Sequence, residues 1–179
     1  MLRRLSALLV VACSAGAGAG FVSNAQAEKT PVAAHIPAIP VVQVSSSAYC
    51  PIPARWRAAF VAAARDSRLP LALLTAVARV ESQFVHTARS VAGARGLLQV
   101  MPTTAQELEL DPDRPEENVL AGARYLRLLF DRFDSSDLAL AAYNAGPTAV
   151  AEAGGAPVGE TVTYVADVTS VWRSLAGCK

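Results

Sequence analysis

The sequence predicts an all-α fold. Three observations predict it: apolar residues recur three and four positions apart through most of the chain after Cys50, prolines stand where helices would begin, and no alternating polar and apolar run is long enough for a strand. The chain has 179 residues, of which 53% are hydrophobic. This length and composition suit one domain with its own core, expected over residues 50–179.

Prolines open the first two expected helices. The first helix covers residues 53–67, and the second covers residues 70–84 with Pro70 at its first position, where the missing N–H is not needed. The first has an inward stripe at spacings of four and three, formed by Trp56, Phe60 and Ala63. Gly93 and Gly96 then mark a loop before a short helix over residues 103–108.

The second half of the chain predicts a long helix and two to three shorter ones. Residues 113–133 form the long helix, with Asp113 and Glu116 at the spacing of a capping box. Its apolar stripe is Val119, Ala123, Leu126, Phe130 and Phe133. A shorter helix follows over residues 137–144, another turn or two is expected over residues 148–153, and residues 160–175 form the last helix. The side chains expected inward on that last helix are Val165, Val168, Trp172 and Leu175.

Glu81 is a carboxylate inside an apolar run. On a helix its neighbours three and four positions away are apolar, namely Val77, Ala78, Phe84 and Val85. An ionised carboxyl there loses hydration and gains no partner, so it retains its proton more strongly. Glu81 is therefore a candidate general acid. The alternative is a Glu at the rim of the buried face, turned to solvent by its flexible stem.

The first residues follow the pattern of a secretory signal over residues 1–27. Arg3 and Arg4 precede a short apolar core, and Ala25-Gln26-Ala27 forms the predicted cleavage site. The core is too short for a lasting span, so no membrane span is expected in the mature chain. A lipid anchor at Cys13 is the alternative. Residues 28–49 are rich in Pro, Ala, Val and Ser, which predicts an extended linker.

The two cysteines left after cleavage predict a disulfide. An exported chain that keeps Cys50 and Cys178 has an even pair, and the bridge would tie the start of the domain to its end. The alternative is a cysteine peptidase that pairs Cys50 with His86 and an Asn. Pro51 directly after Cys50 leaves no obvious helix N-terminus to activate the thiol, and the disulfide explains both cysteines at once.

Composition excludes several classes of function. The formal net charge is +1, and basic residues do not alternate with aromatic ones, so nucleic acid is not an expected partner. Two histidines and three scattered cysteines form no cluster at metal-ligand spacing, so neither a metal nor a cofactor is expected.

Four strings in order resemble the catalytic domain of the soluble lytic transglycosylases, within the lysozyme superfamily. They are VESQF, GARGLLQVMP, LAAYNAGP and ETVTYV, and ENVLAGARYL between them is similar to the family's Asn, Gly, Tyr-Leu segment. The resemblance covers nearly all of residues 55–172. Leu98 stands where the family usually has Met, and Val162-Thr163 where a more polar pair is common.

The resemblance implies a set of site residues. Glu81 is the catalytic acid and then base, Ser82 hydrogen-bonds near the cleaved sugar, and Gln99 lines the cleft. The remaining expected substrate-binding residues are Tyr143, Asn144, Glu160 and Tyr164. Taken alone, Glu160 is also explained as a charge favoured at a helix N-terminus.

The resemblance also implies a reaction. The expected substrate is the β-1,4 bond between N-acetylmuramic acid and N-acetylglucosamine in peptidoglycan, cleaved without water to a 1,6-anhydro product. The chain is expected to act as an exported monomer on glycan strands, in the periplasm or outside the cell. Two alternatives stay open: a muramidase that uses water, and a protein that binds peptidoglycan without cleaving it.

Overall fold

The described part of the computed structural model, residues 48–157 and 159–179, contains seven α-helices and no strand. They are α1 (Ala54–Ser67), α2 (Leu71–Glu81), α3 (Pro102–Glu107), α4 (Pro115–Arg132), α5 (Ser136–Ala145), α6 (Pro147–Ala153) and α7 (Glu160–Ser174). The all-α prediction is confirmed. The expected signal (1–27) and nearly all of the expected linker (28–49) lie outside the described residues.

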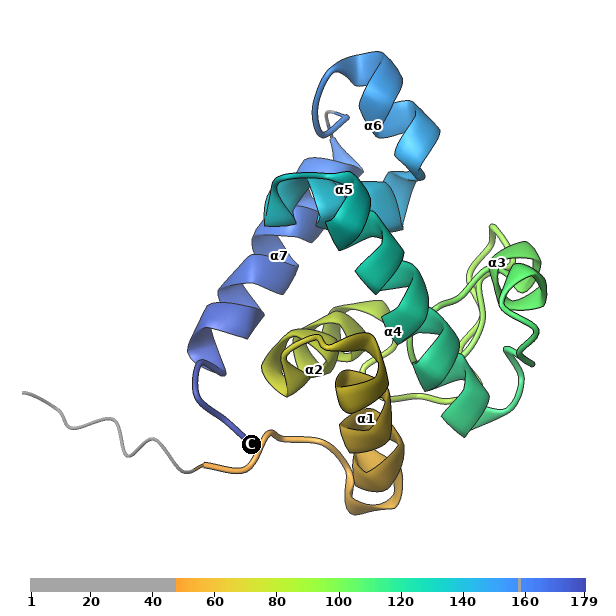
Figure 1. Cartoon of the computed structure of the whole chain (residues 1–179), viewed down its shortest axis with the longest axis vertical. Coiled ribbons are helices and arrows are strands. Elements are labelled where there is room, and N and C mark those ends of the chain that lie inside the picture. Colours follow the sequence, from red (N-terminus) through yellow and green to blue (C-terminus); the bar gives the residue numbers. More distant parts are fainter. Residues whose placement is uncertain (1–47, 158) are drawn as a thin grey trace, which may run out of the picture. The chain divides into compact units, whose positions relative to one another are not determined.

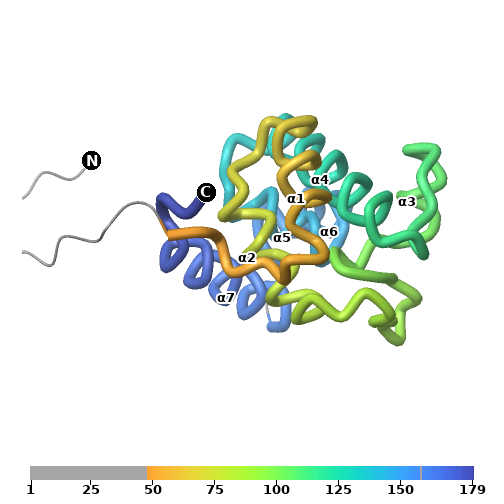
Figure 2. The backbone as a smooth tube through the Cα atoms, turned by 90° about the horizontal axis from the view of Figure 1, so that it is seen from below, coloured from red at the N-terminus to blue at the C-terminus, as the bar shows by residue number. Residues whose placement is uncertain are grey.

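Helix α2 is the centre of the domain. Its seven consecutive residues 72–78 are buried, so the helix is covered on all sides. It packs against α1 and α7, while α4 lies across α1 and carries α5 at its far end (Figures 1 and 2). These seven side chains are apolar except that of Thr75, whose hydroxyl donates to the Leu71 carbonyl at 2.7 Å. The covered part of α2 therefore buries no unpaired polar side chain.

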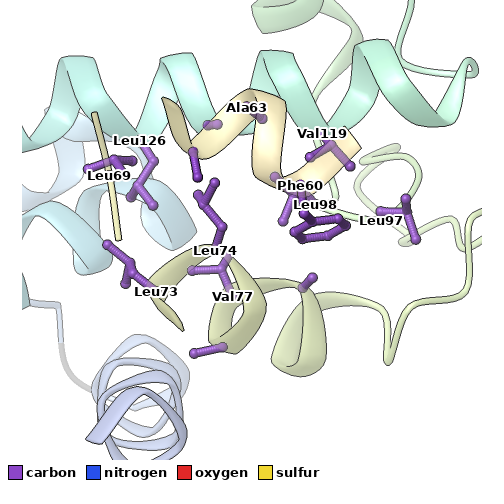
Figure 3. Close-up of a cluster of buried hydrophobic side chains, with 14 of the residues drawn as sticks. Phe60, Ala63, Leu69, Leu73, Leu74, Val77, Leu97, Leu98, Val119 and Leu126 are labelled. Atoms are coloured by element: carbon purple, nitrogen blue, oxygen red, sulfur yellow. The ribbon is translucent and has the colours of Figure 1, made fainter. Parts of the chain in front are cut away.

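The core lies between α1, α2 and α4. Phe60 of α1 lies in one buried cluster with Leu74 and Val77 of α2, and the stripe of α4 closes the cluster from the other side (Figure 3). From that stripe, Val119, Ala123 and Leu126 are buried, and Phe130 and Phe133 are partly buried. Fully burying one such side chain stabilises the fold by roughly 1.5 to 3 kcal/mol.

Two helix ends differ from the sequence prediction. Helix α2 ends at Glu81, not near Phe84, because Gln83 and Phe84 adopt left-handed backbone angles with φ of 51° and 63°. The predicted capping box is wrong: α4 begins at Pro115 and receives no side-chain cap. Asp113 instead pairs with Arg89 and Arg95 of the preceding loop, at 2.9 and 2.6 Å.

The inward face of α7 agrees with the prediction in part. Val168 is buried, and Val165 and Trp172 are partly buried and pack against the core, whereas Leu175 is partly buried outside the core clusters. Thr161 and Tyr164, which are not among the expected inward residues, are also buried. Among the described helices, none is long and apolar enough to cross a bilayer.

A disulfide closes the domain at its two ends. Cys50 and Cys178 are joined across 128 residues, as the sequence predicts. Beside the bridge, the backbone N–H of Cys50 donates to the carbonyl of Lys179, and the N–H of Lys179 donates to the carbonyl of Ala48. The start of the domain is therefore fastened to the segment that follows α7, and α7 is held against α2.

Replacing both Cys50 and Cys178 by Ser should destabilise the fold. Freeing so long a loop raises the entropy of the unfolded chain, so the free energy of unfolding should fall by about 4 to 5 kcal/mol at most. Chemical denaturation with and without a reductant measures the change. The reductant should affect the parent chain and leave the double variant unchanged; an equal effect on both would contradict the role given to the bridge.

Candidate active site

Glu81 is the last residue of α2 and lies where three helices meet. Helix α5 brings Tyr143 and α7 brings Tyr164 to this point, where burial raises the pKa of both phenols and the nearby charge of Glu81 raises it further. Its expected neighbours Phe84 and Val85 are not its helical neighbours, because the helix stops first. Phe84 packs against Phe60 instead, and Val85 is exposed.

The Glu81 carboxyl is poorly solvated. Burial raises its pKa from 4.5 to about 7, and the Tyr164 hydroxyl opposes this shift in part by favouring the ionised form. Tyr164 is only 7% exposed, and its hydroxyl makes no hydrogen bond of good geometry among the described residues. That hydroxyl therefore remains able to donate to Glu81 when the carboxyl loses its proton. Glu81 can thus give and take a proton near neutral pH.

Ser82 and Tyr143 both donate to backbone carbonyls of one buried segment. The Ser82 hydroxyl lies 2.8 Å from the carbonyl oxygen of Leu97, and the Tyr143 hydroxyl lies 2.8 Å from that of Leu98. Ser82 is buried, so its hydroxyl faces the protein interior. The residue after Glu81 and the neighbouring phenol are thus fixed to the same stretch of chain.

Gln99 follows that segment in a left-handed conformation, with φ of 46°. Its side-chain amide donates to the carbonyls of Gly96 and Ala88, at 2.9 and 3.2 Å. A non-glycine residue held in this region is strained, and such strain concentrates at functional sites. Both amide hydrogens are occupied, so only the side-chain oxygen is free to accept a hydrogen bond from a ligand.

Gln99 and Tyr143 line one pocket of about 240 Å³. The other lining residues are Val100, Met101, Thr104, Tyr125, Asn144, Ala145 and Gly146. The rings of Tyr125 and Tyr143 lie 5.6 Å apart between centroids. Aromatic faces beside amide groups suit a sugar, which offers apolar C–H faces and hydroxyls in one molecule.

The remaining candidates lie between α5 and α7. Asn144 is exposed, and its side-chain oxygen accepts a hydrogen bond of 2.9 Å from the Thr161 hydroxyl. Glu160 is exposed at the first residue of α7, one turn before Tyr164. The structure therefore gathers Glu81, Tyr143 and Tyr164 together and leaves Glu160 at the surface. Within residues 48–157 and 159–179, no three metal-ligating side chains come together.

Asn118 of α4 is a buried polar residue to which the sequence reasoning assigned no role. Its side-chain oxygen accepts from the N–H of Leu98 at 2.9 Å, and its amide donates to the carbonyls of Arg95 and Pro112 at 2.7 and 3.0 Å. In the sequence, Asn118 directly precedes the stripe residue Val119 in ENVLAGARYL, the segment that resembles the family. Apolar periodicity alone would place such an Asn at the edge of the buried face of the helix.

Solved structures place this arrangement in a known class. Lytic transglycosylase Slt from Pseudomonas aeruginosa, solved as an inactive Glu-to-Gln mutant, is 30% identical with a TM-score of 0.62, covering 73% of this chain and 25% of that one. The 70 kDa soluble lytic transglycosylase from Escherichia coli is 28% identical with a TM-score of 0.58, covering 69% and 25%. The fold is therefore that of the lysozyme-like domain of these transglycosylases.

The family is shown by the sequence itself. The model of the "Transglycosylase SLT domain" matches residues 58–160, more than half of the chain, and the chain belongs to this family.

Curated relatives are much longer proteins. A membrane-bound lytic murein transglycosylase F 2 from Alkalilimnicola ehrlichii is 37% identical over 101 residues, which are 51% of this chain and 22% of the relative. A soluble lytic murein transglycosylase from Salmonella typhimurium is 38% identical over 84 residues, 40% and 13%. The chain thus matches less than a quarter of the length of either relative.

Replacing Glu81 by Gln should stabilise the fold at alkaline pH. Because the pKa of Glu81 is raised on folding, its protonated form favours the folded state; this contribution is complete below about pH 4.5 and lost as the pH rises through about 7. Gln never ionises, so the variant should be more stable than the parent by about 3 kcal/mol at pH 8.5 and nearly equal at pH 4. Urea unfolding at both pH values measures the difference.

Glu152 of α6 provides the control, because it is an exposed carboxylate. Glu152→Gln should shift stability little and equally at both pH values. A stability gain for Glu81→Gln that does not depend on pH would contradict the titration assigned to Glu81.

Proposed function

We propose that the chain is a peptidoglycan lytic transglycosylase that cleaves the β-1,4 bond between N-acetylmuramic acid and N-acetylglucosamine, with Glu81 as acid and then base. The observation that carries this proposal is the placement of Glu81: a poorly solvated carboxyl with a pKa near 7, close to Tyr143, which lines an aromatic pocket. A carboxyl of this kind can protonate a leaving-group oxygen at neutral pH.

The carboxylates elsewhere favour a one-acid mechanism. Glycoside cleavage by two carboxyl groups needs both on either side of the scissile bond. Among the described residues every other Asp and Glu is exposed, except Glu117, which is partly buried and paired with Arg114 at 2.8 Å. None of these carboxyls lines the pocket that Tyr143 and Gln99 share, so none is placed there to act as nucleophile or to activate water, and a substrate that brings its own nucleophile meets this requirement.

The proposed steps balance without water. Glu81 gives its proton to the bridging oxygen as the bond from that oxygen to the muramyl C1 breaks, and the acetamido group of the same sugar assists. The C6 hydroxyl oxygen then bonds to C1 and its proton passes to the Glu81 carboxylate, which restores the acid. A hydroxyl already held in the same molecule has a large effective concentration over water. The product carries a 1,6-anhydro ring.

The other site residues divide into two groups under this proposal. Gln99, Tyr143 and Asn144 contact the glycan strand in the cleft, and Glu160 lies at its edge. Ser82 and Tyr164 are buried, so they act on Glu81 and its surroundings from inside the protein. Slt from Pseudomonas aeruginosa is inactive as a Glu-to-Gln mutant, which supports an essential Glu in this fold.

Two rival functions share the same pocket. A muramidase would use water in place of the C6 hydroxyl and release a reducing muramic acid. A binding protein would hold glycan without turnover. The raised pKa of Glu81 favours catalysis over binding alone, because a cleft that only binds gains nothing from a buried acid.

We also propose that the chain is exported and acts as a monomer on the cell wall. The relatives are named membrane-bound or soluble murein transglycosylases, and the Cys50–Cys178 disulfide suits an oxidising compartment. Cleavage after Ala27 would release the domain on its linker. The lipid-anchored form at Cys13 is the alternative.

Digestion of purified peptidoglycan tests the reaction. Mass spectrometry of the fragments should find 1,6-anhydromuramic ends, and Glu81→Gln should reduce turnover by about 10²- to 10⁴-fold while the circular dichroism spectrum is retained. Glu152→Gln, an exposed acid on α6, should cleave like the parent. Reducing muramic ends alone would identify a muramidase, and full activity in Glu81→Gln would refute the assignment of the acid.

The mature N-terminus tests export. In cells with a secretion pathway, intact-mass measurement should give a chain that begins at Glu28 and lacks two thiol protons because of the disulfide. A lipid-modified Cys13 would show the anchored form instead.

A further inference from the structure

The backbone of Leu97 and Leu98 lies at the centre of the hydrogen bonds around Glu81. The Leu97 carbonyl accepts from Ser82, the residue after the acid, and the Leu98 carbonyl accepts from Tyr143, the phenol beside it. Both leucine side chains are at most 1% exposed and lie in the main core (Figure 3). Ser82, which directly follows α2, and Tyr143 of α5 are thus oriented by adjacent peptide groups of the loop before α3.

Helix α4 fixes these peptide groups from behind. Asn118 accepts from the Leu98 N–H at 2.9 Å. This N–H belongs to the same peptide group as the Leu97 carbonyl that accepts from Ser82, so that peptide is held on both sides, and the Leu98 carbonyl that accepts from Tyr143 lies in the next peptide group. The Asn118 amide is fully used, because its two hydrogens go to the carbonyls of Arg95 and Pro112. A buried amide with all its partners present resists displacement.

Gly122 completes the support one turn further along α4. A Cβ placed there would lie 2.6 Å from the Leu98 side chain and 2.9 Å from the Tyr143 hydroxyl oxygen. Residues 118 and 122 share a face of the helix, so one face both binds the Leu98 backbone and leaves room for its side chain. Gly96 makes the matching approach from the loop, where a Cβ would lie 2.5 Å from the Asn118 amide nitrogen.

We propose that Asn118 and Gly122 are positioning residues for catalysis, and that they act through the backbone of Leu98: on Ser82 through the Leu97–Leu98 peptide, and on Tyr143 through the Leu98 carbonyl. This inference rests on the proposed role of Glu81 as the acid. The cleavage rate falls steeply when the groups around the reacting bond are slightly misplaced. Releasing the Leu98 backbone should therefore reduce turnover, although Asn118 and Gly122 do not touch the substrate. A second consequence is access of water to Glu81 once Tyr143 is no longer held.

The charged contacts on the same loop provide a matched control. Asp113 pairs with Arg89 and Arg95 at the outer side of the loop, and all three side chains are about one-third exposed or more. Exposed ion pairs of this kind contribute little to stability. Asp113→Ala therefore loosens the same loop and keeps every hydrogen bond to the backbone of Leu97 and Leu98.

The kinetic test is a double-mutant cycle on peptidoglycan cleavage. Asn118→Ala and Gly122→Ala should each lower kcat about tenfold. Combined with Tyr143→Phe, each should lose much less than the product of the two single losses, because both changes release the same residue, Leu98. Asp113→Ala should stay within about twofold of the parent, and its effect should multiply with that of Tyr143→Phe. Losses that multiply for Asn118 and Gly122 would overturn the proposal.

A second measurement needs no turnover. The groups that act on the Glu81 carboxyl are Tyr143 from α5 and Tyr164 from α7, and neither is altered in these variants. Titration of carbon-13-labelled glutamate by NMR should show the pKa of Glu81 falling from about 7 toward 4.5 in Asn118→Ala and Gly122→Ala, since water reaches the carboxyl. Asp113→Ala should leave it in place. An unchanged pKa in the first two variants would overturn the proposal.

The two measurements distinguish failure of the proposed function from failure of the positioning role. If the parent chain does not cleave peptidoglycan, the proposed function fails, while the titration still decides whether Asn118 and Gly122 position the groups around Glu81. If Asn118→Ala does not fold by circular dichroism, Gly122→Ala, which removes no hydrogen-bonding group, carries both tests alone. A kinetic loss that multiplies with that of Tyr143→Phe, or an unchanged pKa of Glu81, would then contradict the proposal.

Discussion

The whole domain depends on burying the end of one helix that carries a carboxyl. Water stabilises an ionised carboxylate, so Glu81 keeps a raised pKa only while α5 and α7, which bring Tyr143 and Tyr164, close around the end of α2. This closure has a cost, because above neutral pH the charge of Glu81 opposes folding. The apolar contacts of residues 72–78 and the disulfide at the ends of the domain offset that cost.

Backbone groups, more than side-chain pairs, connect the parts of the site. The segment from Gly96 to Val100 belongs to no helix and has an isolated β-bridge from Val100 to Arg95, and its carbonyls are bound by Ser82, Gln99 and Tyr143. A carbonyl cannot change its protonation state near neutral pH, so these contacts stay the same while Glu81 gains and loses its proton. The irregular loop is therefore compatible with a precise site because each of these partners is buried or partly buried.

Much of the fold is predictable from the sequence, and the failures have physical causes. Prolines and apolar stripes locate α1, α4 and α7 within a few residues, because each helix buries one regular face. The end of α2 is not predicted, since Gln83 and Phe84 adopt left-handed angles that composition does not signal. The spacing of Asp113 imitates a cap, but its partners, Arg89 and Arg95, come from a loop whose path no local pattern describes.

The site is harder to derive from the residues alone. Glu81 stands out because a charge in an apolar run is unusual, but its true neighbours, Tyr143 and Tyr164, come from helices 62 and 83 positions away in the sequence and require the family resemblance. The disulfide has a further consequence. With Ala48 and Lys179 hydrogen-bonded side by side, the described domain is topologically close to a ring. A short peptide could join these two points, so the order of the helices along the gene could be permuted while every contact around α2 is kept.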